Sequence, residues 1–141
     1  MRQQDIAYGL AETAHRGQFR RDGITPYFYH CMDVAAVAMR RGGRDLEVAT
    51  ALLHDTIEDH RLSFVEMKNA GICEEVMNAV QLLTLNKEFT YEQNIRIIKD
   101  SGNKLAIAVK IADNLANLAD DPTDKQILKY AKSLQILTSN E

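Results

Sequence analysis

The sequence lacks tryptophan and has only two prolines and two cysteines among its 141 residues. Cys31 and Cys73 lie far apart, and neither belongs to a closely spaced cysteine pair of the kind that marks a zinc site or a redox motif. We interpret both as buried or incidental thiols. With 45% apolar and 26% charged residues, the composition is that of an ordinary globular protein and excludes a disordered chain.

The sequence also lacks a long apolar run and an excess of basic residues. No apolar stretch approaches the roughly 20 residues that cross a bilayer, and Met1 is followed by polar and charged residues instead of the apolar core of a signal peptide. The net charge of −3 and the pI near 5.8 argue against a protein that tracks along nucleic acid. We therefore expect a cytoplasmic protein without membrane or nucleic-acid partners, whose ligand can still be a small anion.

Apolar residues recur at helical spacing in almost every segment, as in Ile6, Leu10 and Ala14, and no segment alternates as a strand does. At 141 residues the chain fits one domain that buries roughly two-thirds of its unfolded surface. We predict a single all-α domain over residues 1–141, a bundle of about six to eight helices. The predicted helices cover residues 4–16, 30–41, 45–59, 63–70, 73–84, 90–101, 104–119 and 122–138.

Capping signals mark several of the predicted helix starts. Ser63 with Glu66 and Thr90 with Gln93 each match a capping box, in which the hydroxyl accepts a bond from an orphan amide and the second side chain reaches back. Asp121, which precedes a proline, predicts a further helix N-cap.

The longest predicted loop, residues 17–29, is the segment where function is most expected. It contains Arg20 and Arg21 and delivers His30 to the start of a helix. Taken singly, these residues have ordinary interpretations. The two arginines can be surface charges, and His15, just before the loop, can be a cation favoured at a helix end.

The segment 49–59 begins as an apolar helix and then places four ionisable groups close together: His54, Asp55, Glu58 and Asp59. On a helix these side chains fall within a wedge of about 140° and can face one cavity. Close carboxylates repel one another, and a divalent cation removes that penalty. The alternative is a helix end whose charges face water, which the apolar run directly before it disfavours.

The segment 105–118 is apolar on two faces, as expected of a buried helix. Its remaining stripe consists of Lys110, Asp113 and Asn117, at spacings of three and four. A buried carboxylate needs a cation or several hydrogen-bond donors. Asp113 is therefore either a metal ligand or a structural carboxylate bonded to helix termini.

Taken in order, these pieces resemble the HD phosphohydrolase superfamily, and more narrowly the hydrolase domain of RelA/SpoT proteins. The resemblance runs from about residue 5 to residue 118. A His-Asp pair alone is a weak signal, but four blocks in this order are specific. The blocks are Ala14-His15-Arg16-Gly17-Gln18-Phe19-Arg20, then Gly23 with Pro26-Tyr27 and His30, then Leu53-His54-Asp55-Thr56-Ile57-Glu58-Asp59, then Lys110-Ile111-Ala112-Asp113 with Leu115 and Asn117.

The resemblance implies an all-α HD domain that removes the 3′-pyrophosphate from the alarmones ppGpp and pppGpp, releases GDP or GTP, and typically uses manganese. Carried over by position, the metal ligands would be His30, His54, Asp55 and Asp113. Two imidazoles and two carboxylates suit a divalent ion such as manganese, iron or zinc.

The resemblance also implies roles for five further residues. Glu58 and Asp59 would orient and activate the hydrolytic water as general bases. Arg20 would pack on the guanine base, and Asn117 would contact the nucleoside. Arg21 stands where the family usually has lysine and would meet phosphate.

The sequence departs from the family pattern beside the predicted site. Where the family usually reads Arg-Leu-His-Asn after Asp113, this chain has Asn114 and Ala116, and Cys31 replaces the proline that commonly follows the loop histidine. Every predicted ligand remains, but these changes bear on substrate preference. One alternative is an HD enzyme that acts on another phosphorylated nucleotide, such as a 2′- or 3′-phosphate of a dinucleotide cofactor. A second is a non-catalytic helical module that senses nucleotide or binds a protein. Because the sequence ends before any synthetase domain, we expect degradation of alarmone only.

Overall fold

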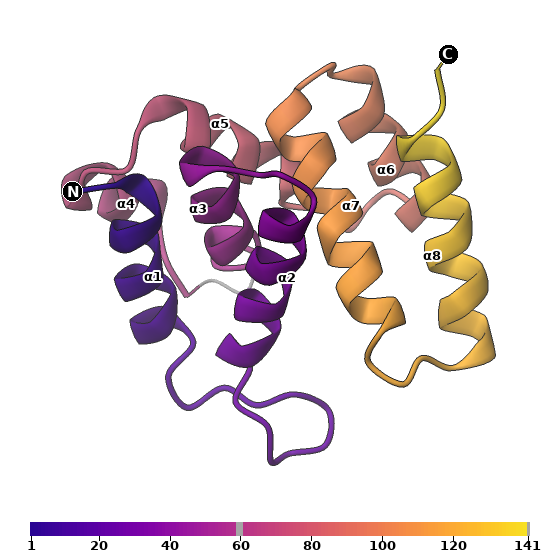
Figure 1. The fold of residues 1–141 in the computed structure, drawn as a ribbon, viewed down its shortest axis with the longest axis horizontal. Coiled ribbons are helices and arrows are strands. Elements are labelled where there is room, and N and C mark those ends of the chain that lie inside the picture. The colour runs from indigo at the N-terminus through magenta and orange to yellow at the C-terminus, as the bar shows by residue number, and fades with distance from the viewer. Residues whose placement is uncertain (59–60, 141) are drawn as a thin grey trace.

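The computed structural model describes residues 1–58 and 61–140. Within these residues the chain forms eight helices and no strand, apart from one isolated bridge between Phe19 and Pro26 (Figure 1). The predicted all-α fold is confirmed. The helices are α1 (Gln3–Ala14), α2 (Phe28–Arg40), α3 (Asp45–Leu53), α4 (Phe64–Ala70), α5 (Glu74–Leu83), α6 (Tyr91–Asp100), α7 (Lys104–Leu118) and α8 (Asp124–Leu137).

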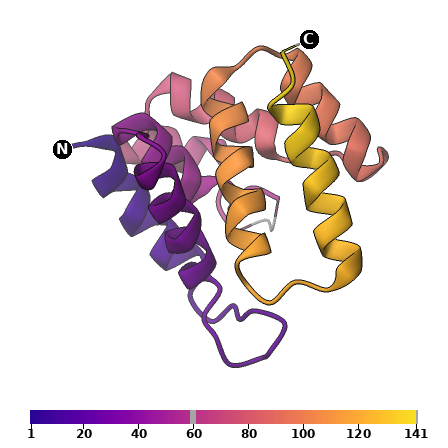
Figure 2. The same cartoon turned by 45° about the vertical axis from the view of Figure 1, so that its right-hand side comes forward.

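Helices α3 and α7 lie at the centre of the packing. α3 packs against α1, α2, α5 and α7, and α7 also packs against α2, α5 and α8. Figures 1 and 2 show α1 to α5 gathered on one side of α7, with α8 on its other side. Because α2, α3 and α7 are in mutual contact, side chains on these three helices and at their ends can converge on one point.

The longest helix in the described part of the chain is α7, with 15 residues. A helix needs roughly 20 apolar residues to cross a bilayer. No helix among residues 1–58 and 61–140 combines the necessary length with the necessary hydrophobicity.

Both predicted capping boxes are present. The Ser63 side chain accepts from the Glu66 amide, and the Glu66 side chain accepts from the Ser63 amide, so both orphan donors at the start of α4 are satisfied. Thr90 and Gln93 make the same reciprocal pair at the start of α6.

The prediction of an N-cap at Asp121 is wrong. α8 begins at Asp124, and its N-cap is Thr123, whose hydroxyl accepts from the Gln126 amide at 3.2 Å while Gln126 reaches back at 2.9 Å. Asp121 has a left-handed backbone with φ of 46°. The reciprocal capping box satisfies two amides, which an isolated aspartate before a proline does not.

The predicted helix 45–59 is also wrong beyond Leu53. The carbonyl of Ala51 accepts from His54 Nδ1 at 2.6 Å, and the carbonyl of Leu53 accepts from the Thr56 hydroxyl at 2.8 Å. In a continuing helix, the amides of residues 55 and 57 would occupy these carbonyls. Local side-chain bonds thus end α3, and residues 54–58 form turns.

We expect the core around α3 to dominate stability. Leu53 is completely buried, so Leu53→Ala should lower the free energy of unfolding by about 2 to 5 kcal/mol through lost burial and a residual cavity. Leu128→Ala on α8 is the matched control, because this leucine is 73% exposed, and its effect should stay within about 0.5 kcal/mol. Urea unfolding measures both, and equal losses would contradict the central position of α3.

Candidate active site

The predicted metal ligands come together where α2, α3 and α7 meet. Ligand atoms of His30, in the first turn of α2, and of His54 and Asp55, just after α3, all lie within 4.8 Å of one another. Asp113 from α7 adjoins them, with its Oδ1 3.0 Å from Nε2 of His30 and 3.5 Å from Nε2 of His54. Helix packing thus unites residues that are up to 83 positions apart.

The ring of His54 is oriented by a hydrogen bond at Nδ1. Because a carbonyl only accepts, the bond to the Ala51 carbonyl places a proton on Nδ1 and turns Nε2 toward the cluster. Nε2 is buried and makes no hydrogen bond to any described residue, although Asp55 Oδ2 lies 3.0 Å away. A buried polar atom without a hydrogen bond points to an additional partner such as a cation.

The charges of the cluster depend on one another. Burial alone would lower the pKa of His54, but the carboxylates of Asp55 and Asp113 raise that pKa well above its ordinary range. Burial opposes ionisation of Asp55 as well, yet the adjacent His54 keeps the pKa of this carboxyl low. The cluster therefore keeps its carboxylates ionised beside a positive charge. Nitrogen and oxygen donors of this kind fit a divalent transition ion.

Asp113 is held from both sides. Its Oδ2 accepts from Lys110 Nζ at 3.0 Å, and its Oδ1 accepts from Asn117 Nδ2 at 3.1 Å. Burial opposes ionisation of Asp113, but the attraction of Lys110 is the leading cause that lowers the pKa of this carboxyl well below its usual range. The polar stripe predicted for this helix thus lies inside the site, and Lys110 joins the site residues although sequence reasoning gave it no role.

Residues that precede α2 contact the cluster, either directly or through one another. The Tyr27 hydroxyl donates to Asp55 Oδ2 at 2.5 Å, and the Tyr27 ring lies 5.0 Å from the ring of His15. His15 is only 2% exposed, and its Nδ1 lies 2.7 Å from Gln18 Oε1. His15 does lie at the end of α1, as its C-cap, but tertiary packing encloses it.

The cluster forms one wall of a cavity of about 640 Å³ that extends between the α1–α2 loop and helices α6, α7 and α8. Tyr91 of α6 and Tyr130 of α8 line it, and no motif in the sequence pointed to either. Asp59 lies outside the described residues. The predicted site residues that line the cavity are Arg20, Arg21, His30, Asp55, Glu58, Asp113 and Asn117.

The α1–α2 loop is a small hairpin that contributes several lining residues to this cavity. The amide of Arg20 donates to the Thr25 carbonyl at 2.8 Å, and Gly23 takes the left-handed turn conformation with φ of 72°. Asp22 accepts from Thr25 and from the amides of residues 24 and 25, which lowers the pKa of Asp22 to about 2. Arg20 also pairs with Asp120 at 2.7 Å, so the loop contacts the α7–α8 connection at the same end of the molecule (Figures 1 and 2).

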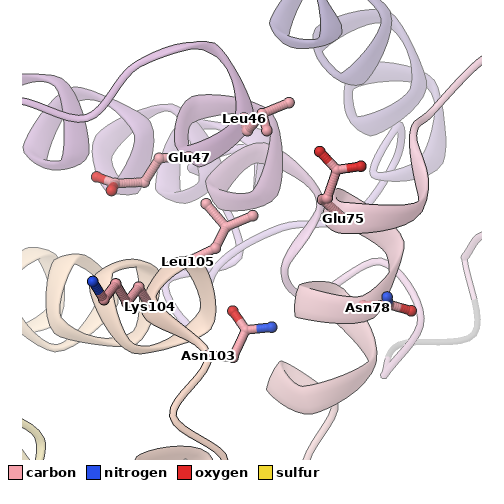
Figure 3. A pocket seen from close by; sticks show the side chains of 7 residues that line it. All are labelled: Leu46, Glu47, Glu75, Asn78, Asn103, Lys104 and Leu105. Carbon is pink, nitrogen blue, oxygen red and sulfur yellow. The ribbon is translucent and has the colours of Figure 1, made fainter.

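A second cavity of about 560 Å³ lies elsewhere, where the N-terminal parts of α3, α5 and α7 meet (Figure 3). Leu46 and Leu105 form the apolar part of its lining, and Glu47, Glu75 and Lys104 carry its charges. No predicted site residue lines this cavity, so the candidate active site is the cavity beside the His-Asp cluster.

The chain is similar to known proteins in sequence. The probable chloroplastic GTP diphosphokinase RSH2 of Oryza sativa subsp. japonica is 31% identical over 126 residues, which cover 79% of this chain but 17% of that protein. The chain thus spans less than a fifth of the diphosphokinase. The guanosine-3′,5′-bis(diphosphate) 3′-pyrophosphohydrolase MESH1 of Xenopus tropicalis is 34% identical over 120 residues, which cover 81% of this chain and 66% of that protein.

The fold is similar to a solved structure described as a metazoan ortholog of SpoT that hydrolyses ppGpp and plays a role in starvation responses. The TM-score is 0.77 at 25% sequence identity, and the match covers 99% of this chain and 87% of the other. The family model of the HD domain matches residues 7–136, a span that contains the entire His-Asp cluster. This chain therefore belongs to the HD domain family.

Proposed function

We propose that this protein is a metal-dependent phosphohydrolase that removes the 3′-pyrophosphate from ppGpp and pppGpp, yielding GDP or GTP and pyrophosphate. The observation that carries the proposal is the His-Asp cluster, which opens onto a cavity whose lining supplies both a carboxylate, Glu58, and two arginines, Arg20 and Arg21. The described activities of the Xenopus relative and of the SpoT ortholog support this substrate class.

We assign metal binding to His30, His54, Asp55 and Asp113. The buried Nε2 of His54, which makes no hydrogen bond and faces two carboxylates, is the strongest support, because a divalent cation can replace the proton at this nitrogen and bind the carboxylates as well. A divalent ion bound there supplies Lewis-acid activation of a water and a phosphoryl oxygen. Manganese as this ion, and a cytoplasmic location, stay predictions.

We assign Glu58, together with Asp59, to proton transfer from the hydrolytic water. Glu58 is half-buried and lines the same cavity as Asp55 and Asp113, so it borders the space that we assign to the hydrolytic water. A carboxylate can take the water's proton as the phosphorus–oxygen bond to the nucleoside breaks. The assignment of Asp59 rests on the sequence, since this residue lies outside the described part.

We assign recognition of the nucleoside to Arg20 and Asn117. Arg20 is paired with Asp120, whose side chain is 62% exposed, and such surface pairs contribute only about 0 to 1 kcal/mol. An entering base can therefore displace Asp120 from the guanidinium. Asn117 Nδ2 donates to the backbone carbonyl and the carboxylate of Asp113. The side-chain oxygen of Asn117 can then accept a hydrogen bond from a hydroxyl of the nucleoside. Arg21 is assigned to phosphate.

A different phosphorylated nucleotide is the second candidate substrate. Asn114, at the position where the family usually has arginine, is completely buried and donates to the Tyr91 hydroxyl at 3.0 Å instead of lining the cavity. Turnover of ppGpp, pppGpp and a 2′-phosphorylated dinucleotide cofactor, each with manganese, separates the two candidates. Failure on all three would favour a non-catalytic nucleotide-binding module.

Metal retention tests the ligand set. The purified protein should carry about one divalent ion per chain, and His54→Ala or Asp55→Ala should lose it, because removal of one ligand leaves an incomplete shell. Asp33→Asn is the matched control, an exposed aspartate one turn after His30 on α2. Elemental analysis measures the ion, and full occupancy in either alanine variant would overturn the assignment.

Glu58→Gln separates metal binding from chemistry. The amide keeps the shape of the side chain but cannot accept a proton, so kcat for ppGpp should fall by about 10² to 10⁴ while metal content stays unchanged. Steady-state kinetics with elemental analysis decides this. A near-normal kcat would mean that the general base is Asp59 or another group and not Glu58.

Arg20→Ala tests recognition of the base. KM for ppGpp should rise about 5- to 30-fold through lost stacking and cation–π contact, while metal content stays unchanged. p-Nitrophenyl phosphate, which has no nucleobase, should be cleaved poorly by both proteins and with little difference between them. Equal losses on both substrates would mean that Arg20 serves the phosphate or the fold.

A further inference from the structure

A lysine of α8 is held against two tyrosine rings. Nζ of Lys129 lies 4.2 Å from the ring centroid of Tyr91 and 5.4 Å from that of Tyr130. The two rings are themselves in edge-to-face contact, with centroids 6.2 Å apart. Cation–π attraction orients an ammonium group but leaves its charge in place, whereas a carboxylate partner would neutralise that charge. Lys129 is thus a positioned positive charge that remains available to an anion.

This exposed lysine lies beside the cavity of the His-Asp cluster: it is not itself a lining residue, but the two rings that it contacts are. Tyr91 and Tyr130 both line that cavity, and so do Lys110 and Arg21. Nζ of Lys110 lies 5.6 Å from the ring centroid of Tyr91, so lysines from α7 and α8 share one ring. Lys110 also bonds Asp113, which places the tyrosine-lined end of the cavity next to the proposed metal ligands.

The positive charge at this end is not balanced by nearby carboxylates. Among residues 1–58 and 61–140, Arg21, Lys125 and Lys129 form no ion pair. Burial first, and then the like charges of Lys110 and Arg21, lower the pKa of Lys129.

Three of the carboxylates that line the same cavity already have partners. Asp113 bonds Lys110, Asp120 pairs with Arg20, and Asp22 accepts hydrogen bonds within its own loop. In a protein of net charge −3, such a local concentration of cations favours binding of an anion.

A hydrogen-bond donor completes the arrangement. Asn114 is fully buried and donates its Nδ2 to the Tyr91 hydroxyl at 3.0 Å. Because that hydroxyl oxygen already accepts a bond, its own hydrogen is left to donate to a second group. Ammonium groups with a fixed hydroxyl donor match the several acceptor oxygens of a phosphate chain.

We propose that Lys129, Tyr91 and Arg21 form a second phosphoryl subsite, which binds the 5′-phosphate chain of the substrate while its 3′-pyrophosphate lies at the His-Asp cluster. The inference rests on the proposed function and deepens it. A nucleotide with phosphate chains on both ribose carbons must place both in one cavity, and this end supplies the second set of cations. Lys129 is then a residue that determines specificity for nucleotides with a 5′ chain.

The test compares two substrates that differ only in the 5′ chain: ppGpp, and guanosine 3′-diphosphate with a free 5′-hydroxyl. Lys129→Gln should raise KM for ppGpp by about 5- to 20-fold and leave kcat unchanged, because a charge-assisted contact is lost in binding. KM for the 5′-hydroxyl substrate should not change. Tyr91→Phe, which keeps the ring, should raise KM for ppGpp by a smaller factor, and Lys129→Arg should largely restore it.

Lys132→Gln is the matched control, since Lys132 lies one turn further along α8 and pairs with Glu92 at 2.7 Å. This variant should leave KM for both substrates unchanged. An equal rise on both substrates with Lys129→Gln, or no rise on either, would overturn the subsite while the proposed activity stands.

The subsite remains testable if the wild-type protein hydrolyses neither substrate, a result that would reject the proposed function. Calorimetric binding of the same two nucleotides to the same variants then decides. A loss of affinity in Lys129→Gln that is confined to ppGpp would support the subsite. Equal affinities, or no binding, would reject it as well.

Discussion

The carboxylate of Asp113, fixed between a lysine and two imidazoles, is the interaction on which the site depends. Its Oδ2 bonds Lys110, and its Oδ1 faces His30 and His54. This geometry exists only because α2, α3 and α7 pack against one another at the centre of the molecule. Burial would make an isolated carboxylate costly, so the lysine and the imidazoles, or a cation held between them, stabilise its ionised form.

Positive charges of two kinds lie in and beside the cavity. At the loop end, Arg20 is paired with Asp120 across the α1–α2 and α7–α8 connections, so its charge is balanced until a ligand displaces the carboxylate. At the helical end, Lys129 is oriented by aromatic rings and keeps its charge. This distribution would allow a protein with an excess of acidic residues to bind the highly charged anion that we propose as its substrate.

The departure from the family pattern at Asn114 changes which residues supply positive charge near the cavity. Asn114 is buried behind the cavity, where it bonds the hydroxyl of Tyr91. The cations near this end come instead from Lys110 of α7 and Lys129 of α8. A change that removes a charge from the sequence motif is thus accompanied by a lysine of α8 and by tyrosines that no short motif contains, and substrate preference depends on them in our proposal.

Hydrophobic periodicity and capping chemistry were enough to predict the helices, because both act within a few residues of the chain. They failed at the end of α3, where side chains of His54 and Thr56 take the carbonyls that would have continued the helix. Ionisable groups next to or within apolar segments made His54, Asp55 and Asp113 conspicuous in the sequence, but only the family resemblance implied the complete ligand set, including His30. Their mutual geometry, the burial of His15 and the pairing of Tyr91 with Lys129 were decided by tertiary packing alone. Tyr91 and Lys129 lie on different helices and are brought together by a fold whose contacts no local pattern encodes.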